Sequence, residues 1–200
     1  MVEIDRSVIE RLIRGEDRAY ALVVDELHGL IYRFLLRLCG DSGLAEDMTQ
    51  ETFLAVWRGI DSFQGRSRFK TWVFGIAYHQ YLRQRDRRAV ETVELVEWDR
   101  SDRSDQSDRS DLSAVVAETE EHALVRRAVY GLPRLYREAV CLVHLEGMSY
   151  REAAKVLDVP IGTLKSRMNG AFRLLRERLA ECEVEGDEVQ RPEGMPGRSG

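Results

Sequence analysis

Apolar residues recur every three or four positions through most of the first ninety residues, which is the spacing of amphipathic α-helices. Between residues 17 and 39 they return to one face without interruption, so one long helix is expected there. A short helix at 7–14 precedes it. Two more helices are expected at about 44–59 and 67–87, joined by a loop in which Gly65 is the pivot.

The periodic pattern ends at about residue 90 and returns at about residue 114. The stretch between includes DRSDRSDQSDRSDLS at 99–113, a repeated Ser-Asp-x triplet with no bulky apolar side chain before Leu112. Such a stretch cannot bury enough surface to offset the entropy lost on ordering. Residues 91–113 are therefore expected to form an acidic, disordered linker.

The second half of the chain repeats the helical pattern on a smaller scale. Four helices are expected, at about 114–130, 133–145, 150–157 and 162–182. Residues 183–200 are polar and rich in glycine, and they are interpreted as a disordered tail. The expected fold class is all-α, with two small helical domains at 1–90 and 114–182 joined by the flexible linker.

The formal net charge of −5 hides a strong segregation of charge along the chain. Residues 64–88 carry seven basic side chains and one acidic one, and residues 151–179 carry seven basic and three acidic. Residues 91–121 carry eleven acidic side chains against three arginines. A polyanion meets the local patch rather than the average charge, so the two basic blocks are candidates for nucleic-acid contact.

Cysteine usage and hydropathy exclude several classes of protein. The three cysteines lie far apart and lack the spacing of metal ligands, so we expect free thiols, no metal site and no cofactor. The N-terminus lacks the basic and apolar regions of a signal peptide. No apolar run approaches the ~18 residues that span a membrane. A cytoplasmic protein with no membrane contact is the expectation.

The segment from Ser149 to Leu179 has the pattern of a helix-turn-helix. Its first helix is short and begins at Ser149, with Glu152 at the capping-box position. Ala153 and Ala154 are small where two helices would cross closely. Side chains near the start of the second helix would face outward, where they can bond to base edges and phosphates in a major groove. An ordinary helical hairpin with a solvated basic face would not be expected to combine these features.

A second pattern runs from Glu46 to Gln80. One face of its first helix is acidic and lies beside aromatic residues, which suits a protein partner with a basic groove. A solvated acidic face would give the same pattern. The following loop and helix interleave aromatic and basic side chains, as in platforms on which unpaired bases stack. Phe69 and Trp72 fit a core role equally well, so the loop at 61–67 is the better candidate for base contact.

Together the two patterns resemble regions 2 and 4 of the sigma-70 family, and in particular its small extracytoplasmic-function (ECF) sigma factors. The carrying residues are AEDMTQETFLAVW (45–57), FQGRSRFKTWVFGIA (63–77) and LPRLYREAVCLVHLEGMSYREAAKVLDVPIGTLKSRMNGAFRLLRERL (132–179). The resemblance implies a promoter-specificity subunit that binds core RNA polymerase, recognises promoter DNA and promotes strand opening. Such a subunit is not an enzyme, because polymerase supplies the active site.

The resemblance also assigns roles to residues. The helix at 44–57 would dock on core RNA polymerase through Asp47, Gln50, Glu51, Phe53 and Trp57. The loop and helix at 61–88 would read the minus-ten element and hold a flipped base through Phe63, Gly65, Arg66, Ser67, Arg68, Lys70, Trp72, Arg83 and Arg87, with Arg83, Arg85, Arg87 and Arg88 on phosphates. The helix-turn-helix would read the minus-thirty-five element through Ser149, Arg151, Thr163, Lys165, Ser166, Arg167, Asn169 and Arg173. An anti-sigma factor that covers both domains is the further expected partner.

Two other functions compete with this one. A self-sufficient helix-turn-helix regulator would bind duplex DNA as a dimer, but the sequence offers no ligand pocket and no dimer helix for it. A nuclease with metal ligands at Glu46, Asp47 and Glu51 is disfavoured, because three carboxylates at positions i, i+1 and i+5 do not converge on one point of a helix surface. Tyr78 and His79 depart from the family, in which an Arg-Asn pair is common at these positions.

Overall fold

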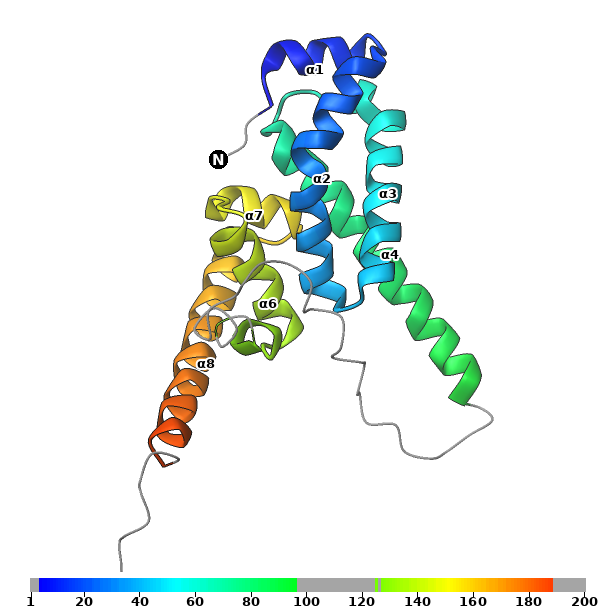
Figure 1. Ribbon diagram of the computed structural model, residues 1–200. Coiled ribbons are helices and arrows are strands. Elements are labelled where there is room, and N and C mark those ends of the chain that lie inside the picture. The colour runs from blue at the N-terminus through cyan, green and yellow to red at the C-terminus, as the bar shows by residue number, and fades with distance from the viewer. Residues whose placement is uncertain (1–3, 97–124, 126, 189–200) are drawn as a thin grey trace, which may run out of the picture.

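The computed structural model describes residues 4–96, 125 and 127–188, and all regular structure within them is helical (Figure 1). The all-α class is confirmed. The N-terminal lobe consists of α1 (Arg6–Ile13), α2 (Asp17–Cys39), α3 (Ser42–Gly59), the 3₁₀ turn η1 (Ile60–Ser62) and α4 (Phe69–Val96). The C-terminal lobe consists of α6 (Arg134–Val140), the π-helical turn η2 (Cys141–Leu145), α7 (Tyr150–Val156) and α8 (Ile161–Glu188).

The central element of the N-terminal lobe is α2, which packs against α1, α3 and α4. Its apolar stripe is buried over its whole length, and Phe34 meets Phe74 of α4 with ring centroids 5.1 Å apart. The helix ends at Gly40, whose left-handed φ of 73° is readily adopted only by glycine. Asp41 then caps α3, because its carboxylate accepts a hydrogen bond of 2.9 Å from the Leu44 amide.

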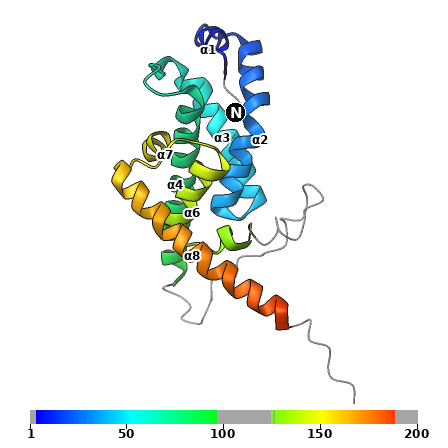
Figure 2. The same cartoon turned by 90° about the vertical axis from the view of Figure 1, so that its left-hand side faces the viewer.

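The C-terminal lobe packs the short helices α6 and α7 against the first half of α8. Figure 2 shows the second half of α8 running away from the rest of the molecule. Helix α6 comes close to α8 at Gly170, where a Cβ atom would lie 2.9 Å from the Tyr136 ring. The absence of a side chain at Gly170 therefore sets the distance between these helices.

A π-helical turn replaces the end of the single helix expected at 133–145. The amide of Glu146 donates to the carbonyl of Cys141 over 2.9 Å, one residue further back than in an α-helix. Gly147 follows with φ of 66°, and the amide of Met148 closes the turn on the carbonyl of Leu142 over 3.0 Å. The sequence periodicity does not predict this wider turn, because it lies at the end of the helix and no further turn follows to show a shifted apolar face.

Two helices are longer than expected. The helix predicted to end at 87 continues to Val96, and the one predicted to end at 182 continues to Glu188. No glycine or proline lies between Gly75 and Val96, so nothing in that sequence terminates the hydrogen-bond ladder. The predicted linker and tail therefore overlap these helix ends. The helix expected at 114–130 lies mostly outside the described residues, as does the rest of the linker.

The two lobes touch in this structure. Helix α7 packs against α4, and α6 and η2 lie against α2 (Figures 1 and 2). Within the described residues, no helix is long and apolar enough to cross a membrane.

Candidate nucleic-acid interface

The helix-turn-helix expected near the C-terminus is present as α7, a turn at 158–160, and α8. The capping box is complete, because Ser149 Oγ accepts from the Glu152 amide and Glu152 Oε2 accepts from the Ser149 amide at 3.0 Å. Asp158 adopts φ of 50°, and it is the one non-glycine residue with positive φ in the described part of the chain. This left-handed residue reverses the chain sharply enough to bring α8 across α7.

The contact between α7 and α8 is built from small and apolar side chains. Ala153 and Leu164 are fully buried and Ala154 is 7% exposed, in agreement with their expected place between the helices. Val159 in the turn is half-buried against the same core. Because this contact is close, the orientation of α8 relative to α7 is fixed, and the opposite face of α8 is turned to solvent.

The predicted minus-thirty-five residues lie on the outer surface of this unit. Thr163, Lys165, Ser166 and Asn169 are exposed, Arg167 is half-buried, and Arg173 is exposed further along α8. Ser149 and Arg151 are exposed at the start of α7. The Ser166 hydroxyl donates to the Gly162 carbonyl over 3.2 Å, which leaves its oxygen able to accept from a ligand.

The predicted minus-ten loop is built around three aromatic rings. Phe63 lies 5.3 Å from both Phe69 and Trp72, with its ring perpendicular to that of Phe69. Phe69 is only 4% exposed and is therefore a core residue, whereas Phe63 and Trp72 remain half-exposed. Gly65 turns the loop with φ of 68°. The three rings pack against one another beside the loop, and the rings of Phe63 and Trp72 remain partly exposed to solvent.

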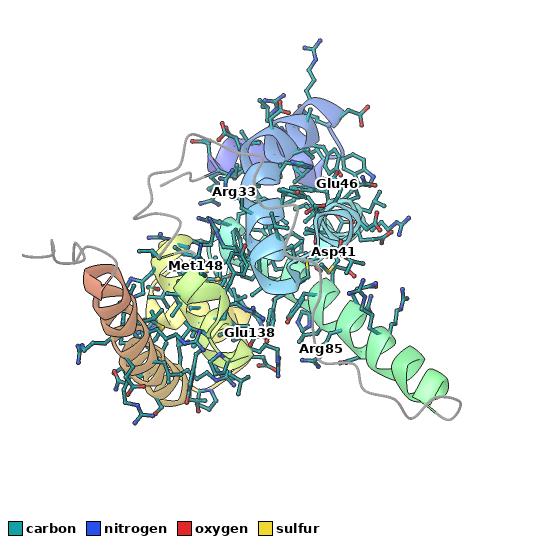
Figure 3. All side chains as sticks on the ribbon, turned by 60° about the horizontal axis from the view of Figure 1, so that its bottom comes forward. Arg33, Asp41, Glu46, Arg85, Glu138 and Met148 are labelled. Carbon is teal, nitrogen blue, oxygen red and sulfur yellow. The ribbon has the colours of Figure 1, made fainter. Side chains whose placement is uncertain are left out.

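Basic side chains surround this loop and continue along α4. Arg66 and Arg68 are exposed in the loop, Ser67 and Lys70 are half-buried, and Arg83 and Arg87 are exposed on α4. Arg85 is paired with Asp86 at 2.6 Å, and Arg88 lies 3.6 Å from Asp41 of α3. Figure 3 labels Arg85 and Asp41. Of the four arginines expected on phosphates, Arg85 and Arg88 thus already have acidic neighbours within the chain.

The acidic face of α3 is exposed at Asp47, Gln50 and Glu51. Trp57 is 36% exposed and packs edge-on against Tyr20 with centroids 4.9 Å apart. Sequence reasoning missed Leu54, which is 42% exposed between these residues and would have been found by following the outward positions of the helix.

Phe53 does not belong to this exposed face. Its side chain is 4% exposed and stacks on His28 of α2, with ring centroids 6.1 Å apart. Phe53 is therefore buried between α3 and α2 in this structure, and its expected contact with core polymerase stays a prediction. The physical reason is that Phe53 lies on the side of α3 that faces α2.

A cleft of about 890 Å³ lies beside the predicted minus-ten loop. Its walls come from α1, from the loop itself and from the turn at 146–148 in the other lobe. Partial burial acts to raise the pKa of Glu152 on this wall, but hydrogen bonds from Ser149 and the charge of Arg68 outweigh it, and the net shift is downward. No group of three metal-ligating side chains exists among the residues that the structure describes.

Comparison with known proteins matches both halves of the chain. The family described as "Sigma-70 region 2" matches residues 23–90, and that described as "Sigma-70, region 4" matches residues 122–175. These ranges contain the loop with its basic helix and the helix-turn-helix.

Relatives match over most of their length. The chain is 33% identical over 171 residues to the RNA polymerase sigma-H factor of Pseudomonas aeruginosa. This match covers 83% of this chain and 89% of that protein. It is 31% identical over 169 residues to the ECF RNA polymerase sigma-E factor of Escherichia coli K12, covering 82% and 88%. The sigma factor RpoE of Bartonella quintana, solved with the anti-sigma factor NepR, superposes with a TM-score of 0.63 at 26% identity, covering 80% and 96%. The two region matches and these relatives show that the chain belongs to the sigma-70 family and is an extracytoplasmic-function sigma factor of RNA polymerase.

Proposed function

We propose that this sigma factor uses three separate surfaces for three different binding events. The acidic face of α3 binds core RNA polymerase, the loop at 63–72 with the exposed side of α4 opens and holds the minus-ten element, and α8 reads the minus-thirty-five element. The observation that carries the proposal is the exposed basic and polar face of a helix-turn-helix whose two helices bury their apolar side chains against each other. A second basic surface, with half-exposed aromatic rings, lies on the other lobe.

Each surface has the chemistry that its role requires. Lysine, arginine and asparagine at the start of α8 can donate to base edges and phosphates in the major groove. The half-exposed rings of Phe63 and Trp72 can stack on a base removed from the duplex, which offsets a few kcal/mol of unstacking. The carboxylates of α3, placed beside Leu54 and Trp57, suit a basic and partly apolar groove on core polymerase.

We further propose that an anti-sigma factor inhibits this protein. The protein itself acts in the cytoplasm, together with core polymerase. The support is that related sigma factors have been crystallised with anti-sigma factors, among them the Bartonella quintana protein. An anti-sigma factor that covers the α3 face would compete directly with core polymerase. Copurification of the chain from cells grown without stress, followed by identification of a stoichiometric partner, tests this part of the proposal.

In vitro transcription with purified core polymerase tests the roles proposed for the three surfaces. The wild-type chain should direct initiation at defined start sites on genomic DNA. Lys165→Ala and Arg167→Ala should weaken protection of the upstream element, and Glu51→Lys should weaken binding to core polymerase itself. Glu26→Lys, which makes the same charge change at an exposed position of α2, is the matched control.

The competing function has a different signature. A self-sufficient regulator would bind a specific duplex tightly without polymerase in a gel shift. If the chain binds a specific duplex in this way and fails to bind core polymerase, the roles proposed for the three surfaces are wrong.

A further inference from the structure

His28 of α2 lies outside the three proposed binding surfaces but contacts two side chains of α3. Its ring stacks on that of Phe53, with the ring centroids 6.1 Å apart and the ring planes inclined by 14°. Its Nε2 atom lies 3.9 Å from Oε1 of Glu46, which is labelled in Figure 3. The long helix α2 therefore places an imidazole at the edge of the acidic face of α3.

Glu46 connects His28 to the exposed part of that face. The same oxygen, Oε1, accepts a hydrogen bond of 3.2 Å from Nε2 of Gln50, one turn further along α3. The side chains of His28 and Glu46 are 44% and 43% exposed, so a proton can reach the imidazole without any opening of the fold. Phe53 is buried beside the imidazole, and the stacking of the two rings keeps the imidazole next to Glu46.

The interaction between His28 and Glu46 depends on the protonation of the imidazole. A distance of 3.9 Å is too long for a hydrogen bond, so a neutral imidazole gains little from Glu46. An imidazolium at the same place forms an ion pair with the carboxylate. On its own helix the nearest titratable groups are Asp25 and Tyr32, each about one turn away, and from α3 the charged group that faces it is Glu46.

The charge of His28 matters because of the carboxylates beside it. Glu46, Asp47 and Glu51 give this part of α3 three negative charges. One positive charge on His28 offsets a third of them. Histidine is the side chain whose charge normally changes between about pH 5 and 8, and a change of charge at the rim of an interface acts mainly on the rate of association.

We infer that His28 is a positioning residue of the polymerase-binding surface and that it sets the charge of that surface. Neutral His28 leaves the full negative charge of α3 available to core polymerase. Protonated His28 draws Glu46 toward α2 and offsets part of that charge, so core polymerase binds more slowly in mildly acidic solution. The inference rests on the proposed role of the acidic face of α3.

The test is the rate at which the full chain associates with purified core polymerase, measured by stopped-flow fluorescence. The rate is compared at about pH 8 and about pH 6, on either side of the range in which imidazole titrates. Low salt, about 50 mM, keeps the screening of exposed charges weak. Far-UV circular dichroism at both pH values shows whether each chain is folded.

Two substitutions separate the charge of His28 from its ring. His28→Phe keeps an aromatic ring against Phe53 and can carry no charge, and His28→Gln replaces it if that variant does not fold. His28→Lys keeps a positive charge at both pH values. His79→Gln removes an exposed imidazole from α4 and is the matched control.

The His28→Phe chain gives the background, because core polymerase itself contains groups that titrate. Between about pH 8 and about pH 6 the wild-type rate should fall about two- to threefold more than the His28→Phe rate, which is the size expected of one exposed charge pair. His28→Lys should associate slowly at both pH values, and His79→Gln should match the wild type. A purely structural role of His28 would change the rate equally at both pH values.

Two results bear on different parts of the argument. If the wild type and His28→Phe have the same pH dependence while Glu51→Lys weakens binding, the role of His28 is wrong and the polymerase-binding surface stands. If Glu51→Lys binds core polymerase as fast and as tightly as the wild type, the proposed surface on α3 is wrong, and the role of His28 falls with it.

Discussion

The same substitution, glycine to alanine, should have opposite effects at two helical positions. At Gly170 of α8 a new Cβ would lie 2.9 Å from Cζ and 3.0 Å from the hydroxyl of Tyr136 on α6. At Gly75 of α4 a new Cβ would have no heavy atom within 4 Å. Both glycines have helical neighbours on either side, so the intrinsic helix preference of alanine acts equally at the two sites.

The magnitudes follow from these distances. Alanine in a helix interior is favoured over glycine by about 0.8–1.0 kcal/mol, which is the whole expected effect at Gly75. Forcing an extra methyl group into a well-packed contact costs about 1–3 kcal/mol. Gly170→Ala should therefore lower the free energy of unfolding by up to about 2 kcal/mol, while Gly75→Ala raises it by about 1 kcal/mol.

Urea denaturation followed by far-UV circular dichroism measures both variants, since the signal reports helices of both lobes. A Tyr136→Leu change in the Gly170→Ala background should recover part of the loss, which a double-mutant cycle would express as a favourable coupling. If Gly170→Ala stabilises the chain as much as Gly75→Ala does, the ring of Tyr136 yields freely and the reasoning about close helix packing is refuted.

Three other predictions concern the cap, the buried phenols and the basic helix. Ser149→Ala should lower the free energy of unfolding by about 1 kcal/mol, because α7 loses its capping box, and urea denaturation measures this. Burial, and then the charge of Glu138, raises the pKa of both Tyr78 and Tyr81, so these phenols should stay protonated in an alkaline absorbance titration when ordinary tyrosines ionise. Their contribution to stability is complete below the unfolded-state pKa of about 10 and is lost as the pH rises above it. Arg83→Ala and Arg87→Ala should each reduce the salt dependence of promoter binding by about one unit in the log–log slope.

Each of these has a contradicting outcome. An unchanged denaturation midpoint for Ser149→Ala would mean that the capping box is not formed in solution. Ionisation of all seven tyrosines in one step near pH 10 would contradict the buried phenols. Arg18→Ala controls for net charge in the salt titrations, and an equal change of slope in that variant would remove the assignment to α4.

Long, regularly periodic segments were predicted well because their apolar spacing and their stop signals agree. The helix at 17–39 was predicted at its observed ends, since the apolar stripe runs unbroken up to Gly40. The capping box at Ser149 was also recognisable, because both of its residues lie within one turn. Helix ends and caps depend on residues that are neighbours in sequence, so the sequence predicts them directly.

Features that depend on distant residues were not predictable. Phe53 looked like an exposed aromatic because its burial depends on His28 of another helix. Tyr78 looked like a departure from the family, and only the structure shows its hydroxyl on Glu138, sixty positions away in sequence. The pairing of the buried Glu146 with Arg37 follows the π-helical turn, and the apolar pattern does not reveal that turn because it ends the helix.

The polar pairs at the contact between the lobes have a consequence for the solubility of the chain. Surfaces such as those around Arg37, Lys70 and Glu146 are well hydrated once they separate. Apolar side chains in place of these pairs would leave adhesive patches on both lobes whenever the lobes part, and such patches promote aggregation. Any parting of the two lobes would thus expose charged, hydrated side chains at these positions and would not favour precipitation.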